Sequence, residues 1–194
     1  SFGGRLIALR LEGIPLRLPP LTTETIITLT KDLIVGTFII ALFEEVVTRG
    51  YIQTRLQEAW NLGGVILTAL LFASLHLPSA FLDPGHDLRA VLFRFAQTGL
   101  SGFILGYIYW RTKSVPTTIA LHGLWNFGAS LALHLSGLPT SPFPPDQMLF
   151  HLLWLGGEGM LTALICQALF PQKRTATGCP PSVRQERGEQ GQWV

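Results

Sequence analysis

Three charged residues, Glu44, Glu45 and Arg49, stand together at the end of a long apolar stretch of the sequence. On an α-helix, positions four apart lie about 40° apart around the axis, whereas positions five apart lie about 140° apart. We therefore expect Glu45 to pair with Arg49 and Glu44 to point elsewhere. A carboxylate that the arginine does not engage is free for chemistry. The alternative is a cluster of charges at the end of a helix, at a membrane interface.

Two histidines and an asparagine can complete a site around Glu44. Counted from a turn that we expect at Asn61, Glu44 lies 17 residues back and His76 lies 15 residues forward. At about 1.5 Å per residue, these separations are about 25 and 22 Å along two antiparallel helices. His122 and Asn126 are four residues apart on one face of a later helix. If the first helix projects by about 10 Å beyond the others, the sequence predicts that all four side chains lie in one layer.

Such a set of side chains permits two kinds of chemistry. A carboxylate and an imidazole can activate a water as a general base, while a second imidazole and an amide can stabilise an oxyanion. These are the groups that a hydrolase needs to act on an acyl group, most simply a peptide bond. Alternatively, Glu44, His76 and His122 could bind a divalent metal such as zinc, with water in the open position.

The sequence favours the first kind of chemistry. The pattern His-Glu-x-x-His, with which many proteases bind zinc, is absent. The charge of Arg49 nearby would also oppose a cation. The residues therefore require no cofactor, and a zinc site stays an alternative.

The composition places this layer of side chains inside a membrane. Of the 194 residues, 48% are hydrophobic and 13% are charged, about half the charged share of a soluble domain. A soluble all-α bundle would have to hide too many leucines behind too few charges. Two cysteines exclude a disulfide scaffold, and a net charge of +2 is too small to suggest a nucleic-acid partner. We predict an integral, multi-pass protein of the cell membrane, with the lipid bilayer as its first partner.

The elements that position the layer are predicted to be helices only. We expect a polytopic transmembrane helix bundle with about five spans, over residues 22–60, 65–77, 91–110, 116–135 and 147–170. A span needs about 20 apolar residues, so the second run is short and the first is long enough only with its glutamates included. Pro78 is expected to end the second run, with a loop over residues 79–88. Residues 1–21 are predicted to be an interfacial segment, 22–170 the domain, and 171–194 a disordered tail.

The charges also predict an orientation. Lys and Arg are more numerous on the side of the bundle that holds the Asn61 turn. Cytoplasmic loops carry an excess of these residues, so we expect that turn and the tail to face the cytoplasm.

Three short motifs resemble those of a known family. They are Glu44-Glu45-x-x-x-Arg49, Phe72-x-x-x-His76 and His122-x-x-x-Asn126. Together they resemble the CPBP intramembrane proteases, also called the Abi or CAAX prenyl protease 2 family. This family includes type II CAAX prenyl endopeptidases and lysostaphin-resistance-like proteins. The motifs occur in the family's order and at similar separations, over roughly residues 22–135.

The resemblance implies roles for the four polar residues of the predicted layer. Glu44 and His76 would activate the water, and His122 and Asn126 would stabilise the oxyanion. The family has been described both as metalloproteases and as metal-independent glutamate peptidases, so the resemblance leaves the metal open.

The resemblance further implies supporting roles. Glu45 and Arg49 would hold the arrangement, and Phe72 would pack at the site. The chain would be an intramembrane endopeptidase for a protein or peptide substrate, with CAAX-type processing of prenylated proteins as one option. The alternatives are a non-catalytic membrane scaffold or bacteriocin-immunity protein of the same fold, and a transporter with a buried proton relay.

Overall fold

The computed structural model describes residues 20, 22–82, 87–136 and 145–170. The described residues form helices and no strand, which confirms the all-α fold class. Most of the predicted interfacial segment 1–21, and all of the predicted tail 171–194, lie outside the described residues. The helices in chain order are α2 (Thr23–Asp32), η1 (Leu33–Ile40), α3 (Ala41–Glu45), η2 (Val46–Gln53), α4 (Thr54–Trp60), α5 (Leu62–Leu75), α6 (Leu77–Leu82), α7 (Leu88–Thr112), α8 (Val115–Ser136) and α9 (Pro145–Leu169).

The first five of these elements form one continuous helix from Thr23 to Trp60. Thr22 caps its start, because its hydroxyl oxygen accepts a hydrogen bond from the backbone N–H of Thr25 at 3.2 Å. Two stretches, η1 and η2, are π-helical and flank α3. Such wider turns are frequent at functional sites in other proteins. Here they flank the segment that carries Glu44 and Glu45.

The long helix turns sharply into α5 at Asn61. This residue has a φ of 48°, and the next helix begins directly after it. A side chain at Gly64 would lie 2.6 Å from the backbone of Leu56 and Gln57, so only a glycine permits this close a hairpin. The predicted turn at Asn61 is therefore present, and it takes up this one residue.

The second run continues beyond the point where Pro78 was expected to end it. The helix breaks at His76 and resumes as α6 at Leu77, with Pro78 in the first turn of the new helix. Proline is tolerated there because a first-turn N–H has no helical partner. The predicted loop over 79–88 is therefore wrong for residues 79–82. It is also wrong for Leu88, which begins α7 after the N-cap Asp87.

Four helices in the described part of the chain are long and apolar enough to cross a membrane, where about five were predicted. They are Thr23–Trp60, Leu62–Leu82, Leu88–Thr112 and Met148–Leu169. The remaining predicted span corresponds to α8, which is 22 residues long and carries His122, Asn126 and several hydroxyl groups. The fold class of membrane-spanning helices is confirmed.

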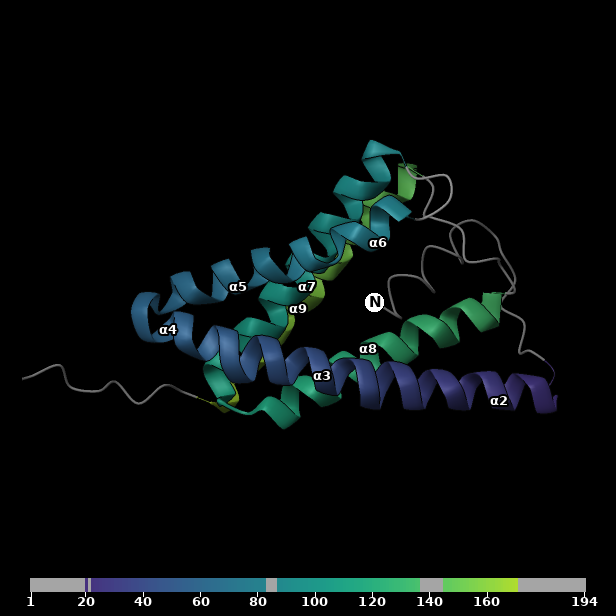
Figure 1. The fold of residues 1–194 in the computed structure, drawn as a ribbon, viewed down its shortest axis with the longest axis horizontal. Coiled ribbons are helices and arrows are strands. Elements are labelled where there is room, and N and C mark those ends of the chain that lie inside the picture. The colour runs from purple at the N-terminus through teal and green to yellow at the C-terminus, as the bar shows by residue number, and fades with distance from the viewer. Residues whose placement is uncertain (1–19, 21, 83–86, 137–144, 171–194) are drawn as a thin grey trace, which may run out of the picture.

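The helices pack in two groups that join near the Asn61 end and diverge away from it (Figure 1). In one group α7 packs between α5 and α9. In the other, α8 lies along η1 and α3. The closest approach in this second group is at Gly123, where a built Cβ would lie 2.3 Å from Cγ2 and 3.0 Å from Cα of Thr37.

This close approach predicts that Gly123→Ala destabilises the fold. The added methyl group meets backbone as well as side chain, and overpacking of this kind costs about 1–3 kcal/mol. The control is Gly156→Ala on α9, where a built Cβ has no atom within 4 Å. Thermal unfolding in detergent should show a lower Tm for Gly123→Ala alone. Equal Tm values for both variants would contradict the close packing of α8 on η1.

Candidate active site

An ion pair between Glu45 and Arg49 lies at the centre of the site. The two residues are one helical turn apart, and both side chains are fully buried. Nε of Arg49 lies 3.2 Å from Oε2 of Glu45, in an ion pair whose N–H is not aligned for a hydrogen bond. The other carboxylate oxygen, Oε1, lies 2.9 Å from Nδ1 of His122 on α8. Glu45 thus joins its own helix to a second one, as the four-residue spacing alone could not show.

Arg49 also ties the long helix to α7. Its Nη2 donates to the carbonyl oxygen of Gly102 at 3.0 Å. One turn further on, Nε2 of Gln53 donates to the carbonyl oxygen of Gly106 at 2.7 Å. A side chain at Gly106 would lie 2.9 Å from Oε1 of Gln53, so the glycine leaves room for this contact. The pair Gly102-x-x-x-Gly106 is a helix-packing motif typical of membrane proteins.

Glu44 points away from Arg49 and toward two imidazoles. Its Oε1 lies 3.9 Å from Nε2 of His76, and its Oε2 lies 3.7 Å from Nε2 of His122. The side chains of Glu44 and His76 are about one quarter exposed, at 26% and 27%, and that of His122 is 11% exposed. Oε2 of Glu44 is buried and has no hydrogen-bond partner. The structure therefore brings together three of the four residues of the predicted layer around an unsatisfied oxygen.

The partners of the two imidazoles fix which ring nitrogen carries the proton. Nδ1 of His76 lies 2.8 Å from the carbonyl oxygen of Phe72, and Nδ1 of His122 lies 2.9 Å from Glu45. Both partners can only accept, so each Nδ1 carries a hydrogen. In the neutral imidazoles, Nε2 then presents a lone pair toward Glu44. Carboxylate oxygens and Nε2 atoms thus face one another as acceptors, and they need a donor between them.

Phe72 is buried and packs against three polar members of the site. Its ring centroid lies 4.6 Å from that of His76 and 6.1 Å from that of His122. Cζ of Arg49 lies 4.9 Å from the same centroid, within the range of a cation–π contact. The predicted packing role of Phe72 is consistent with this position, because one ring limits the movement of both imidazoles.

Asn126 lies one turn beyond His122 on α8. Its Nδ2 donates to the carbonyl oxygen of Gly36 on η1 at 3.3 Å. An amide carries two N–H donors, so one stays available for another acceptor. The structure thus places Asn126 on the correct helix face, in contact with the long helix.

The described residues do not form a ready-made metal centre. Within the described ranges, no group of three or more His, Cys, Asp or Glu side chains is arranged to hold a metal ion. The two imidazoles face different oxygens of Glu44. Zinc held by Glu44, His76 and His122 stays an alternative prediction.

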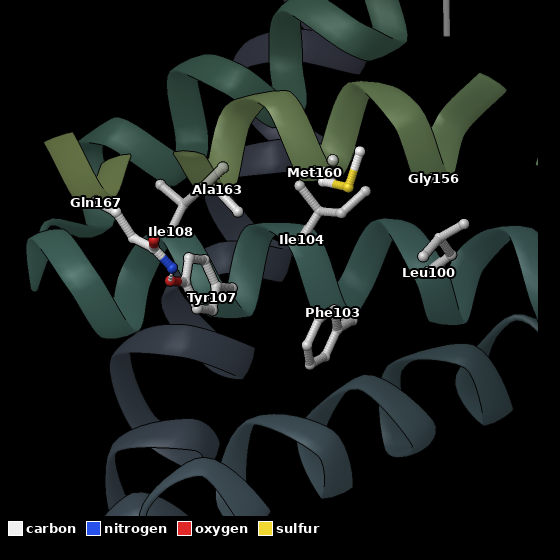
Figure 2. A pocket seen from close by; sticks show the side chains of 10 residues that line it. Leu100, Phe103, Ile104, Tyr107, Ile108, Gly156, Met160, Ala163 and Gln167 are labelled. Carbon is white, nitrogen blue, oxygen red and sulfur yellow. Dashed lines mark hydrogen bonds between the residues drawn. The ribbon is translucent and has the colours of Figure 1, made fainter. Parts of the chain in front are cut away.

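Two apolar pockets lie away from this site. One, of about 310 Å³, lies between α7 and α9 and is lined by Phe103, Ile104, Tyr107 and Met160 among others (Figure 2). The other, of about 490 Å³, lies on α9 beside Trp154 and Glu158. Neither contains a residue of the predicted site.

Sequence reasoning missed the residues that anchor the site to α7. The signal was present, because Arg49 and Gln53 share the four-residue spacing of Gly102 and Gly106. It was not interpretable without knowing that η2 and α7 are neighbours.

These features define a class of protein. Apolar helices enclose a carboxylate between two oriented imidazoles, within an integral membrane protein. Residues 27–128, just over half of the chain, match the family described as Rce1-like, type II CAAX prenyl endopeptidase. The chain therefore belongs to this family of CAAX-type intramembrane proteases, which confirms the resemblance of the motifs. No curated protein and no solved structure matches the chain.

The central ion pair predicts a stability effect. Glu45→Gln or Arg49→Ala leaves the other charge buried and unpaired, which typically costs about 3–5 kcal/mol. Arg55→Ala is the matched control, since the Arg55–Glu58 pair is 67% and 61% exposed and such pairs contribute about 0–1 kcal/mol. Thermal unfolding in detergent should separate the two classes of variant. A Tm of Arg49→Ala equal to that of Arg55→Ala would show that the central pair is solvated.

Proposed function

We propose that the chain is an intramembrane endopeptidase in which Glu44 and His76 activate a water for attack on a peptide bond. The observation that carries this proposal is the carboxylate of Glu44, which lies 3.9 Å from Nε2 of His76 and whose buried Oε2 has no hydrogen-bond partner. A water has the two donors that Glu44 and His76 lack. Bound between them, it donates one hydrogen to Glu44 and the other to Nε2 of His76.

Glu44 suits the role of general base because it is not neutralised by Arg49. The positive charge is matched by Glu45 one residue along the chain. Glu44 therefore keeps its own charge for taking the proton from the water, and His76 lies beside it to share or pass on that proton. General acid–base groups of this kind typically contribute about 10²–10⁴-fold to the rate.

His122 and Asn126 are proposed to stabilise the oxyanion. For this role Nε2 of His122 must carry a hydrogen when the oxyanion forms, unlike in the neutral ring described above. Nδ1 keeps its contact with Glu45 at 2.9 Å, which fixes the direction of the ring. The second amide N–H of Asn126 is the other donor. Both groups act on negative charge that develops only as the bond is attacked.

The proposed substrate is a protein or peptide with a prenylated CAAX-type C-terminus. The support is the family match, whose members are described as CAAX prenyl endopeptidases. The apolar outer faces of the helices support a site within a lipid bilayer, and we propose a multi-pass arrangement in the cell membrane, with the Asn61 turn in the cytoplasm.

We expect Glu44→Gln to abolish cleavage while leaving the fold intact. Glutamine keeps the shape of the side chain but cannot take the proton, so activity should fall by at least about 100-fold. The assay is cleavage of a fluorogenic CAAX peptide, with and without the prenyl group, by the purified protein. Glu58→Gln, on the exposed end of the same helix, is the control.

The outcomes of this assay separate the alternatives. Wild-type rates for Glu44→Gln would contradict the assignment of the base. No cleavage of either peptide by the wild-type protein would favour a non-catalytic membrane protein of the same fold.

We also expect the activity to survive removal of divalent metals. Three ligands are not arranged around a common point among the described residues, and the guanidinium of Arg49 lies close by. Purified protein dialysed against EDTA, and against 1,10-phenanthroline, should cleave the reporter peptide at the undialysed rate. Loss of activity that added zinc restores would overturn the metal-free mechanism.

A further inference from the structure

A row of four polar side chains follows one face of α8 at intervals of four residues. Its members, here called the α8 polar row, are His122, Asn126, Ser130 and His134. Residues four apart share a helix face, and this face lies along the long first helix (Figure 1). The function proposed above uses only the first two members, at one end of the row.

The other two members meet a carboxylate on the first helix. The hydroxyl of Ser130 donates a hydrogen bond to Oδ2 of Asp32. Nε2 of His134 lies 3.6 Å from the same oxygen. Between this group and the site, Asn126 donates to the carbonyl oxygen of Gly36. From Asp32 to the site, successive polar contacts of α8 with the first helix are therefore no more than one turn of α8 apart.

Asp32 lies within the first candidate span. It precedes Glu44 by 12 residues, and His134 follows His122 by 12 residues, so both helices cover about 18 Å at about 1.5 Å per residue. An ionisable group inside a span is costly and usually faces the protein interior or a water-filled space. A lipid chain cannot satisfy these groups, because it offers no hydrogen bonds.

The exposure of the side chains falls along the row toward the site. Asp32 and His134 are 34% and 30% exposed, whereas His122 is 11% exposed. The row is thus more exposed at the end far from Asn61 than at His122, beside which Glu44 is 26% exposed. It ends at the buried Oε2 of Glu44, which has no partner.

We propose that the α8 polar row and the facing side of η1 form a hydrated route by which water reaches Glu44 from the membrane surface opposite the Asn61 turn. This inference rests on the proposed hydrolysis. Each peptide bond cut consumes one water, whose oxygen and one hydrogen go to the acyl carbon and whose other hydrogen goes to the leaving amine. Within a bilayer that water needs a polar path, and the row supplies polar groups together with the Gly36 carbonyl that Asn126 contacts.

The test is the reactivity of single cysteines on α8 with a small, charged, water-soluble thiol reagent. The full chain is kept in its membrane, and its two native cysteines are replaced by Cys166→Ala and Cys179→Ser. Ser130→Cys and His134→Cys lie on the row. Leu124→Cys, at a position 61% exposed on the surface of the bundle, and Leu131→Cys, adjacent to the row, are the controls.

We expect both cysteines on the row to be labelled rapidly and the two control cysteines to stay unlabelled. The reagent reacts with the thiolate, which forms only in water. Labelled Ser130→Cys should also lose most of its cleavage of the reporter peptide. Unreactive cysteines at both row positions in a protein with the Tm of the wild type would show a dry, purely structural row and overturn the route. Full activity after labelling of Ser130→Cys would also overturn it.

The labelling needs no substrate. It therefore decides for or against the hydrated route even if the wild-type protein cleaves no peptide, an outcome that would contradict the proposed hydrolysis separately.

Discussion

The rest of the structure depends on satisfying two opposite charges that are buried completely. Glu45 and Arg49 neutralise each other, but each has further hydrogen-bonding capacity to fill. Glu45 meets this need on α8 through His122, and Arg49 meets it on α7 through the Gly102 carbonyl. Because lipid offers no substitute partner, the three helices must come together for either charge to be tolerated. One ion pair therefore specifies the arrangement of three helices.

This demand also explains why two adjacent glutamates behave so differently. Glu45 is held on one side by Arg49 and on the other by His122, so it is not free for proton transfer. Glu44 projects from the same helix in another direction and meets only the Nε2 atoms of two imidazoles at 3.7–3.9 Å. The charge of Glu45 is compensated by its partners, whereas Oε2 of the adjacent Glu44 has no hydrogen-bond partner. The ring of Phe72 packs against the guanidinium of Arg49 and against the imidazoles of His76 and His122.

Local spacing predicted a good part of this site. The four-residue interval of Glu45 and Arg49 gave their pairing, and equal distances from the Asn61 turn gave the approach of His76 to Glu44. Both arguments work because helix geometry converts residue numbers into angles and heights. The orientation of the imidazoles could not be obtained in this way, since it depends on a backbone carbonyl and on a carboxylate from another helix.

The fold was predictable as a set of helices, and less so at their ends. Pro78 was expected to terminate a helix, but a proline can equally occupy the first turn of the next one, as it does in α6. The role of α7 could not be predicted, because backbone carbonyls at Gly102 and Gly106 carry no side-chain signal. The π-helical stretches on either side of α3 were likewise not predicted from the sequence.

The polar side chains of α8 have a consequence for biogenesis. A helix that carries two histidines, an asparagine and several hydroxyl groups is poorly retained by lipid on its own. Its polar face becomes tolerable once the first helix is present to receive it, since Asp32, Gly36 and Glu45 supply the partners. Insertion of α8 is therefore coupled to its association with a helix made earlier by the ribosome. The site gains its second imidazole at the same step, so the nascent chain holds only half of the site until α8 is in place.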